Sequence, residues 1–486
     1  MKKPPYGMIA ILFIGAFVAF LNNTLLNVAL PTIMVEFDVT PSQVQWLTTA
    51  YMLVNGILIP ASAYFIQKFT NRSLFITAMS LFTLGTLLAF VAPGFWTLVA
   101  GRMIQASGSA IMMPLLMNVM LIAFPIERRG TAMGLFGLVM IMAPAIGPTL
   151  SGFIVENYSW RVLFAMILPF ALLPLLLAIF KLKNITPQRE VTLDKFSLVL
   201  SSFGFGGLLY GFSVAGDEGW TSWIVLLTLG VGTIGLLWFV LRQLKLDQPL
   251  LEFRIYKYPM FALASAISIV LSAAMFSGMI LTPLYVQTIR GFSPLDSGLL
   301  MLPGALVMAV MSPITGRLFD SFGAKWLAII GLSISAATTF ALSGLTMETS
   351  YESIMFLYTM RMFGFSMITM PVMTNGLNQL STHLYPHGTA MNNTLQQVSG
   401  AIGSAIFLTI MNARMTNWIN DQVESAKHAG DFPLDSLGQS QFMSQLTRQG
   451  MLEGITYSFL IAAIVTMVAL LLSFFIKRVV PKREAI

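Results

Sequence analysis

The chain contains no cysteine and little charge of either sign. Without cysteine, disulfides and thiolate metal sites are excluded. Asp, Glu, Lys and Arg make up 10% of the 486 residues, and hydrophobic residues make up 56%, whereas soluble proteins average about 25% charged residues. So few charges cannot cover a surface that faces water, and the chain must therefore lie mostly in lipid.

Markers of several other protein classes are missing too. The chain has no G-x-x-x-x-G-K-[ST] loop, which argues against ATP-driven transport. The histidines of HLYPH, His383 and His387, lie beside a proline and lack a third metal ligand. No cluster of reactive side chains suggests an enzyme. We therefore expect no catalytic residue, no metal and no cofactor.

The chain is instead rich in long apolar runs. A spanning helix needs about 20 apolar residues, and fourteen segments qualify. The first is expected to be retained, because its apolar run continues without the cleavage site of a signal peptide. The approximate ranges are 8–30, 44–66, 74–93, 97–122, 131–154, 161–181, 196–215, 221–241, 260–286, 293–315, 326–346, 353–378, 391–412 and 453–476. The expected fold is an all-α membrane protein with 14 transmembrane helices.

Lysine and arginine are distributed unevenly between the two sides of these spans. If the N-terminus is cytoplasmic, the outer segments hold only Arg161, Arg290, Arg414, Lys427 and Arg448. Arg102 and Arg361 fall inside spans, and every other lysine and arginine falls in an inner segment. The positive-inside rule then predicts that both termini are cytoplasmic. This topology explains the net charge of +7 without a nucleic-acid partner.

The two halves of the chain repeat each other. The inner-loop sequences AYFIQKFTNRSL and GRLFDSFGAKW align with Gln67 over Asp320. RGTAMG aligns with HGTAMN at nearly the same spacing, and so do the two arginines inside spans. Three markers at about one offset imply two homologous six-span halves, an architecture found in many secondary transporters.

The repeat divides the chain into three expected parts. The first is an N-terminal six-helix bundle, 1–181. The second, 182–259, holds two extra transmembrane helices and their linkers. The third is a C-terminal six-helix bundle, 260–486, which carries an extracellular loop at about 412–452 to which the sequence assigns no role.

Five stretches carry a resemblance to a known family. They are LNNTLLNVALP (21–31), QWLTTAYMLVNGILIP (45–60), GRMIQASGSA (101–110), APAIGPTLSG (143–152) and SWRVLF (159–164). In this order and at these depths, the chain resembles the fourteen-span drug:H+ antiporters of the major facilitator superfamily, and among them the lincomycin-resistance type exporters of Gram-positive bacteria. The resemblance implies proton-coupled multidrug efflux across the cytoplasmic membrane, with the proton gradient as energy source.

The antiporter motif concentrates weak helix formers in an apolar run. Proline in a helix interior costs about 3 kcal/mol in water, and glycine about 1 kcal/mol. In lipid, however, small residues mark the faces where helices touch. The resemblance implies that this small-residue ridge seals or opens the exit path, whereas the alternative is a kinked packing helix with no gating role. The residues concerned are Ala143, Pro144, Gly147, Pro148 and Gly152.

The two arginines inside spans are expected to be functional, because an intramembrane charge costs about 2.5–3.5 kcal/mol. Arg102 belongs, with Gln105, to a motif that the resemblance links to proton coupling. Arg361 has only its symmetric position to support a role. The alternative for both is snorkelling to the outer headgroups.

Carboxylates are scarce where a proton carrier is needed. Many relatives in the family carry an aspartate where Asn22 stands, and asparagine cannot titrate. None of the 20 acidic residues falls in the central third of an expected span. We expect proton coupling through Glu156, one turn after the antiporter motif, or through Asp217. The alternative for either is an ordinary interfacial carboxylate.

The inner loops predict a gate in the second half only. In this gate, a helix-end aspartate faces an arginine of a partner loop and holds two spans together. The second half keeps the pattern in Gly316, Asp320, Gly323 and Lys325. In the first half, Gln67 replaces the aspartate.

Polar stripes on the spans predict the lining of a substrate cavity, and interhelical hydrogen bonding is the alternative for single amides. Methionine-rich walls would suit varied apolar ligands. The expected cavity residues are Asn22, Asn23, Asn27, Gln105, Arg361, Asn392, Asn393, Gln396 and Gln397.

The predicted function is therefore proton-coupled export of amphipathic drugs and antibiotics. The expected partners are small amphipathic substrates, protons and membrane lipid, and the expected oligomeric state is a monomer. An exporter of an endogenous lipid or metabolite, or a solute importer of the same fold, is the alternative.

Overall fold

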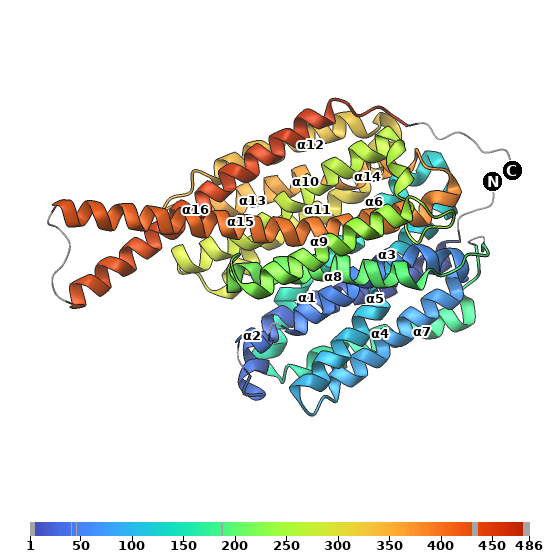
Figure 1. The fold of residues 1–486 in the computed structure, drawn as a ribbon, viewed down its shortest axis with the longest axis horizontal. Coiled ribbons are helices and arrows are strands. Elements are labelled where there is room, and N and C mark those ends of the chain that lie inside the picture. Colours follow the sequence, from blue (N-terminus) through green and yellow to red (C-terminus); the bar gives the residue numbers. More distant parts are fainter. Residues whose placement is uncertain (1–4, 40, 45, 186–187, 430–435, 480–486) are drawn as a thin grey trace.

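The computed structural model describes residues 5–39, 41–44, 46–185, 188–429 and 436–479. Within these ranges most residues are helical and no strand occurs. The first helix begins and the last helix ends at the same end of the molecule (Figure 1), which we call the termini end. A two-helix hairpin projects from the opposite end, the hairpin end.

The first bundle contains six long helices. They are α1 (Tyr6–Glu36), α3 (Trp46–Lys68), α4 (Asn71–Phe90), α5 (Phe95–Ala123), α6 (Arg129–Asn157) and α7 (Arg161–Lys181), with the short α2 (Pro41–Val44) and η1 (Ile126–Arg128) between them. In this bundle α1 packs against α5, α6 and α7, and α4 packs against α5 and α7.

The second bundle follows the same plan with longer final helices. Its helices are α10 (Pro259–Leu284), α11 (Pro294–Phe322), α12 (Ala324–Leu342), α13 (Tyr351–Ser366), α14 (Thr369–Leu377), α15 (Tyr385–Ala429) and α16 (Ser436–Ser473), with the short η2 (Phe253–Lys257), η3 (Tyr285–Ile289) and η4 (Thr382–Leu384). The two bundles meet chiefly where α6 packs against α11 and where α15 packs against α3 and α5.

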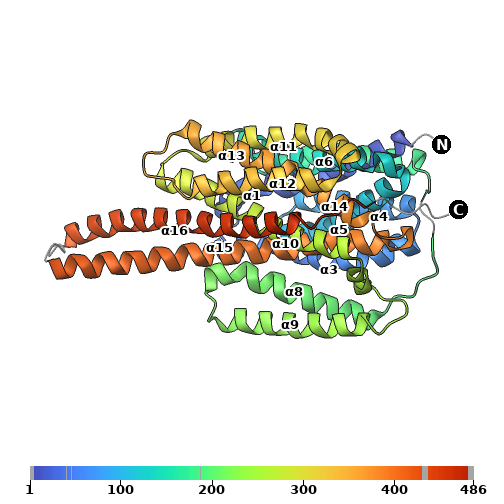
Figure 2. The same cartoon turned by 90° about the horizontal axis from the view of Figure 1, so that it is seen from above.

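The extra helices α8 (Lys195–Glu218) and α9 (Trp223–Gln243) form a pair on one flank of the bundles (Figure 2). Helix α8 contacts α3 of the first bundle and α15 of the second. Trp46 stacks on Tyr210 with ring centroids 5.7 Å apart, and the Trp220 indole N–H donates to the Thr409 hydroxyl at 2.6 Å. The pair is therefore tied to both bundles.

Among the described residues, twelve helices are long and apolar enough to cross a membrane. Helices also occupy the other two expected ranges: α6, whose assessed apolar part is Arg129–Ala143, and the pair α13 and α14. An all-helical membrane fold is thus confirmed, and the count of fourteen spans stays a prediction.

The expected span 353–378 is broken rather than continuous. Helix α13 ends at Ser366 and α14 begins at Thr369. Pro371 lies in the first turn of α14, and proline has no N–H with which to bond the carbonyl four residues before it. The missing hydrogen bond explains why the helix restarts here.

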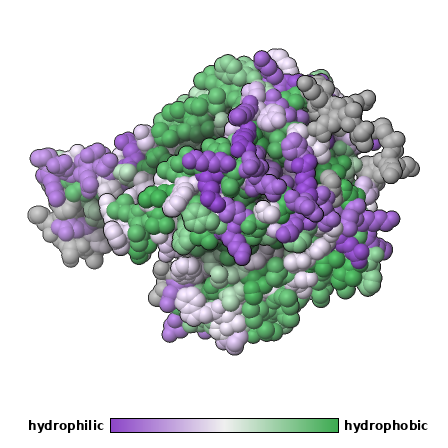
Figure 3. Space-filling view, turned by 45° about the vertical axis from the view of Figure 1, so that its right-hand side comes forward, coloured by the Kyte–Doolittle hydropathy of each residue, from purple (hydrophilic) through white to green (hydrophobic). Residues whose placement is uncertain are grey.

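The described parts of the outer segment, 412–429 and 436–452, are helical. Helices α15 and α16 have 45 and 38 residues, and at about 1.5 Å per residue both exceed the roughly 30 Å of a hydrocarbon core. Their far ends form the projecting hairpin (Figure 2). Figure 3 shows hydrophilic residues gathered at the termini end and on this hairpin, with apolar residues on the flanks between them.

Candidate functional site

The closest approach between the bundles is the contact of α6 with α11 at the termini end. A Cβ on Gly130 would collide with the carbonyl oxygen of Gly316, and a Cβ on Gly316 with that of Gly130. The Ser312 hydroxyl donates to the Gly134 carbonyl at 2.8 Å. Because backbone meets backbone here, only glycine fits at the crossing, and small residues mark a tight interhelical contact as expected in lipid.

Asp320 closes this contact by capping the N-terminus of α6 from the other bundle. Its carboxylate accepts from the Gly130 N–H at 2.8 Å, the Thr131 N–H at 2.9 Å and the Thr131 hydroxyl at 2.8 Å. The first N–H groups of a helix lack partners within the helix, and a negative charge is favourable there. Asp320 therefore holds α6 by charge and by three hydrogen bonds.

An arginine of a partner loop was expected to face Asp320, but the arginine next to the groups that Asp320 binds has other contacts. Arg129 is buried and donates to the Tyr385 hydroxyl at 2.6 Å and to the Asn378 side-chain oxygen at 3.2 Å. Asp320 instead accepts from backbone N–H groups, because α6 begins at Arg129 and the N–H groups of the next two residues point at α11. Both contacts join the bundles, and both lie at the termini end.

The rest of the inner-loop motif shapes the end of α11. Gly323 follows this helix at φ 79°, a left-handed conformation that favours glycine. The Arg478 guanidinium donates to the backbone oxygens of Asp320 and Ser321 at 2.8 and 3.1 Å, so a cation sits at the negative C-terminal end of the helix. Lys325, in the first turn of α12, is half-buried.

Gln67 occupies the equivalent place in the first half and meets His387. The Gln67 side-chain nitrogen lies 3.0 Å from His387 Nε2 and 3.1 Å from the Ala63 carbonyl oxygen. The Glu252 backbone N–H donates to His387 Nδ1 at 3.3 Å. The aligned inner loops show that Gln67 replaces an aspartate, but they do not show that Gln67 contacts His387. The alignment of RGTAMG with HGTAMN does place Arg129 and His387 at equivalent positions.

The antiporter ridge of α6 packs against α1 of its own bundle. A Cβ on Gly147 would collide with the Thr24 hydroxyl, and the Ser151 hydroxyl donates to the Leu25 carbonyl at 2.5 Å. Ala143 is fully buried, whereas a Cβ on Gly152 would meet no atom within 4 Å. The side chains of Pro144 and Pro148 lie outside the described part of the structure.

Arg102 is the centre of a polar cluster inside the first bundle. Its side chain is 1% exposed and donates to the Gln105 oxygen at 3.0 Å and to the Asn23 oxygen at 3.4 Å. The guanidinium lies 4.2 Å from the centre of the Tyr51 ring, which adds a cation–π contact. The side chain therefore points into the bundle instead of snorkelling.

Asn22 joins this cluster as a neutral donor. Its amide donates to the Gln105 oxygen at 3.2 Å, and Gln105 donates in turn to the Thr86 hydroxyl at 2.8 Å. A carboxylate at this position would have faced the same oxygen that Arg102 binds. The asparagine thus keeps the network connected, and among the side chains that the structure describes Arg102 forms no ion pair.

Arg361 is the equivalent arginine in the second bundle and is fully buried. It donates to the Thr339 hydroxyl at 3.0 Å and to the Ala274 carbonyl, and it stacks over Phe365 at 5.0 Å. Its Nη1 has no hydrogen-bond partner and lies against Gly278, where any Cβ would overlap it. Among the side chains that the structure describes, no Asp or Glu is buried.

The amides expected to line a cavity are partly engaged with protein groups. Asn392 donates to the Met373 sulfur at 2.7 Å and Asn393 to the Thr389 carbonyl at 2.9 Å. Gln396 and Gln397 are half-buried on the next turn of α15. The side chain of Asn27 lies outside the described part of the structure.

The carboxylates expected to carry protons are peripheral or undescribed. Glu156 is exposed in the last turn of α6 at the hairpin end, and the side chain of Asp217 lies outside the described residues. Sequence analysis missed Glu36, because α1 continues six residues beyond the expected span end at 30. The Glu36 carboxylate accepts from the Trp160 indole at 2.6 Å and from the Arg161 guanidinium.

The surroundings of Glu36 stabilise its charged form. Partial burial alone would raise its pKa, but the hydrogen bonds from Arg161 and Trp160 outweigh that effect and hold the pKa of Glu36 below its usual value. Both donors belong to SWRVLF, so Glu36 ties α1 to the start of α7. The pair lies within one bundle and does not join the two.

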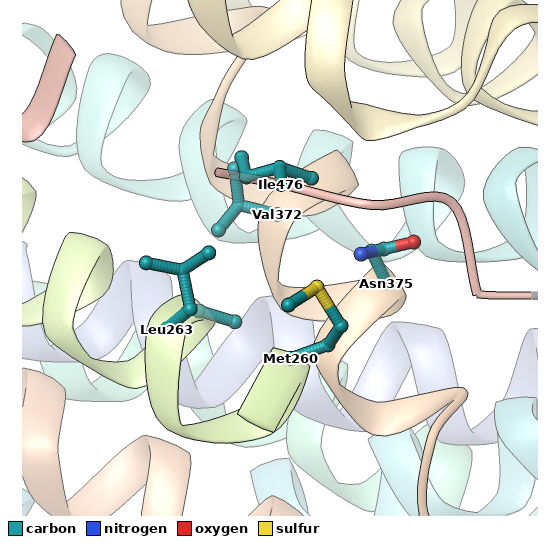
Figure 4. A pocket seen from close by; sticks show the side chains of 6 residues that line it. Met260, Leu263, Val372, Asn375 and Ile476 are labelled. Atoms are coloured by element: carbon teal, nitrogen blue, oxygen red, sulfur yellow. The ribbon is translucent and has the colours of Figure 1, made fainter. Parts of the chain in front are cut away.

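A small apolar pocket lies beside α14 at the termini end (Figure 4). The roughly 160 Å³ between its lining side chains includes open solvent and leaves essentially no room for a water molecule, so it is far smaller than the roughly 300–1,000 Å³ of a typical ligand site. Asn375 donates to the Lys477 carbonyl at 3.0 Å and so ties the chain after α16 to this pocket. The lining residues are Met260, Leu263, Ala264, Val372, Asn375 and Ile476.

The two histidines of HLYPH point to different partners. His383 Nδ1 lies 2.9 Å from the Ser381 hydroxyl, while the ring of His387 contacts Gln67 and Glu252. The described residues contain no group of three or more His, Cys, Asp or Glu side chains placed to hold a metal ion.

Comparisons with known proteins place these features in a family. Residues 12–404 match the model of the Major Facilitator Superfamily. The chain belongs to this superfamily. It is 48% identical over 488 residues to the uncharacterized MFS-type transporter YcnB of Bacillus subtilis, with 100% of this chain and 98% of that protein covered. It is 41% identical over 477 residues to the lincomycin resistance protein LmrB of Listeria monocytogenes, with 98% of each covered.

More distant similarities concern the superfamily or the fold alone. A multidrug resistance protein B homolog of Mycobacterium tuberculosis is 28% identical over 444 residues, with 90% of this chain and 82% of that protein covered. The crystal structure of the human organic anion transporter MFSD10 superposes with a TM-score of 0.65 at 12% identity, covering 96% of this chain and all of the other. The chain is thus a superfamily transporter whose relatives include lincomycin and multidrug resistance proteins.

Proposed function

We propose that this transporter exports amphipathic small molecules, antibiotics among them, across the cytoplasmic membrane in exchange for protons. The observation that carries the proposal is full-length similarity, at 41% identity, to proteins named for lincomycin resistance. The antiporter ridge on α6, with Gly147 pressed against Thr24, supports export over import, since the resemblance associates this motif with exporters.

The proposed topology has fourteen spans with the termini end in the cytoplasm. The uneven distribution of lysine and arginine supports this orientation. The α15–α16 hairpin is then extracellular. The chain has no cysteine, so Ser73→Cys and Ser425→Cys, both at exposed positions, give a direct test. An impermeant thiol reagent applied to intact cells should label Ser425→Cys alone, and labelling of Ser73→Cys would overturn the orientation.

Alternating access gives the contacts at the termini end their role. With these contacts made, a path from the cytoplasm is closed between the bundles. Opening it requires α6 to leave Asp320 and Gly316, and α15 to leave Gln67. An amphipathic substrate is proposed to meet a polar lining of amides and one arginine. These residues are the half-buried Gln396 and Gln397, together with Asn22, Asn23, Asn27, Asn392, Asn393 and Arg361.

The proton is proposed to act through a carboxylate near the outer side. Glu156 remains the first candidate and Asp217 the second, and Arg102 would bias the ridge through its hydrogen bonds with Gln105 and Asn23. Glu156→Gln fixes the neutral form and should abolish uptake driven by a pH gradient into inverted vesicles while ligand binding persists. Loss of uptake in Asp217→Asn alone would move the assignment to Asp217.

The proposed function is tested by dye export from energised cells. Cells that express the protein should extrude an amphipathic dye faster than vector-only cells, and a protonophore should remove the difference. Export that resists the protonophore would overturn proton coupling. A panel that includes a fluorescent phospholipid distinguishes the alternatives, because transport of that lipid without any drug-like dye would indicate an endogenous substrate.

A further inference from the structure

His387 is the point at which three separate parts of the chain meet. It lies in the first turn of α15, where its ring reaches Gln67 at the end of α3 and the backbone of Glu252 just before η2. The ring is 7% exposed. The Arg189 N–H also donates to the Gln67 carbonyl at 2.9 Å, which adds the linker before α8 to the cluster.

Three hydrogen-bonding contacts depend on the protonation state of this ring. They are Glu252 N–H to Nδ1, the Gln67 amide to Nε2, and the same amide to the Ala63 carbonyl. A neutral imidazole has one N–H and one acceptor nitrogen. With its hydrogen on Nδ1, it keeps both contacts of the Gln67 amide. With its hydrogen on Nε2 and the Gln67 amide turned by about 180°, the ring still accepts from the Glu252 N–H and donates to the Gln67 side-chain oxygen.

The protonated ring keeps fewer of these contacts. An imidazolium carries a hydrogen on both nitrogens, so Nδ1 would face the Glu252 N–H donor to donor. The Gln67 amide would have to turn its oxygen toward Nε2 and give up its bond to Ala63. One of the three contacts survives, against two for either neutral form.

The charges around the ring also disfavour an imidazolium. Arg189 and His383 act on it electrostatically. The Glu252 carboxylate is turned away toward Arg254, at 3.6 Å, and accepts from the Arg254 N–H at 3.0 Å. The charged or titratable side chains within four residues of His387, Gln67, Arg189 or Glu252 are Tyr64, Lys68, Arg189, Glu190, Glu252, Arg254, Tyr256, His383 and Tyr385.

We propose that His387 is a positioning residue whose neutral ring holds α15 against α3, and whose protonation from the termini side loosens this contact and favours opening there. The proposal rests on the alternating-access function proposed above. On this proposal the contact between Gln67 of α3 and His387 of α15 is sensitive to pH. The contact of Asp320 with α6 contains no histidine.

The repeat supplies a matched pair of reporters for this proposal. Ala132, behind the Asp320 contact, and Ala390, behind the His387 contact, are equivalent in RGTAMG and HGTAMN, and both are fully buried. Single Ala132→Cys and Ala390→Cys variants would be compared by their rates of maleimide labelling in proteoliposomes, without substrate or gradient. Taking the ratio of the two rates at each pH removes the common dependence of the reaction on thiolate.

The expected result is a rise in the Ala390→Cys to Ala132→Cys ratio between pH 8 and pH 5.5. The rise should be about fivefold, the factor that corresponds to one net hydrogen bond. His387→Gln, which is neutral at every pH, should flatten the ratio. A ratio that stays flat with His387 present, or one that rises equally with His387→Gln, would overturn the proposal.

The two cysteine reporters make the test independent of whether the His387→Gln variant folds and of whether the proposed function is correct. If His387→Gln fails to fold, the pH response of the parent pair alone decides. Labelling needs no transported substrate, so a pH-dependent ratio with no dye export would leave the His387 role standing and count against drug export only.

Discussion

Two of the contacts that join the bundles at the termini end occupy equivalent places in the repeat but differ in chemistry. At one, the Asp320 carboxylate accepts three hydrogen bonds at the N-terminus of α6. At the other, the Gln67 amide meets the His387 imidazole. The repeat has preserved the place of closure and not its chemistry. A carboxylate that accepts three hydrogen bonds at a helix terminus makes a strong contact, whereas an amide facing a histidine makes a weaker one that depends on one proton.

The packing behind the two contacts differs in the same way. Gly130 meets the backbone of Gly316 across the interface. Its counterpart Gly388 faces the side-chain ends of Leu377 and Leu380, within 2.6–2.8 Å of an added Cβ. Backbone cannot yield as a leucine end can. The α6–α11 contact is therefore rigid across the interface, whereas Gly388 packs against side chains of its own bundle, in and just after α14.

The largest expected effect comes from one methyl group at this rigid contact. Gly130→Ala should reduce export more than about tenfold, because overpacking against backbone costs about 1–3 kcal/mol and disfavours the closed state. Gly388→Ala is the matched control and should stay within about threefold of the parent. The measurement is the initial rate of dye export per protein in the membrane. Equal losses in the two variants would show that export is as sensitive to packing within a bundle as to packing between the bundles.

The next effect removes the charge. Asp320→Asn should slow export about tenfold, because hydrogen bonds to a charged group contribute about 1.5–3 kcal/mol each. Gln67→Ala removes only neutral bonds and should slow export about threefold. Measuring both at pH 7.5 keeps His387 largely neutral. A larger loss in Gln67→Ala than in Asp320→Asn would reverse the ranking of the two contacts.

A smaller effect is expected farther along α6, at the antiporter ridge. Gly147→Ala presses on the Thr24 side chain, whose hydroxyl can rotate away but whose Cβ, 2.8 Å from the added methyl group, requires a small shift of α1 against α6. Export should therefore fall about fivefold, which corresponds to about 1 kcal/mol, the low end of overpacking. Gly152→Ala enters open space and should export normally. A loss in Gly147→Ala as severe as that in Gly130→Ala would move the main gate from the termini end to the ridge.

The smallest effect is expected at the hairpin end, where the ion pair of Glu36 and Arg161 lies within one bundle. The folded-state pKa of Glu36 is lowered, so its contribution to stability is present above the unfolded pKa of about 4.3 and is lost as the pH falls through the folded value. Glu36→Gln should lower the melting temperature slightly at pH 7, since exposed pairs contribute little. The difference from the parent should shrink below about pH 4.3, while export stays unchanged. A difference that persists in acid would indicate lost packing instead of lost charge.

Much of this organisation could be predicted from the sequence because it depends on local composition. Apolar runs of spanning length predicted the membrane class, and the aligned inner loops predicted that Asp320 and Gln67 differ. The break between Ser366 and Thr369 was missed because Pro371 lies inside an apolar run that reads as one span. Glu36 was missed because a helix end in lipid headgroups need not coincide with the end of the apolar run.

The partners of the gate residues could not be predicted, because they depend on where helices from different bundles begin. Asp320 was expected to meet an arginine, yet α6 starts at Arg129 and presents the N–H groups of Gly130 and Thr131 to it. His387 was considered only as a metal ligand. Its pairing with Gln67 joins residues 320 positions apart, a distance at which no local pattern is informative.

The central claim, that the termini end opens and closes in each export cycle, is tested most directly by locking it shut. A Cβ at Gly137 on α6 would touch the Ser312 hydroxyl on α11, so Gly137→Cys with Ser312→Cys should form a disulfide between the bundles in this cysteine-free chain. Dye export by the double variant would be measured after oxidation and again after reduction, with each single variant as control. The account predicts that the oxidised protein does not export and that reduction restores its rate to that of the single variants. Undiminished export by the fully cross-linked protein would contradict it.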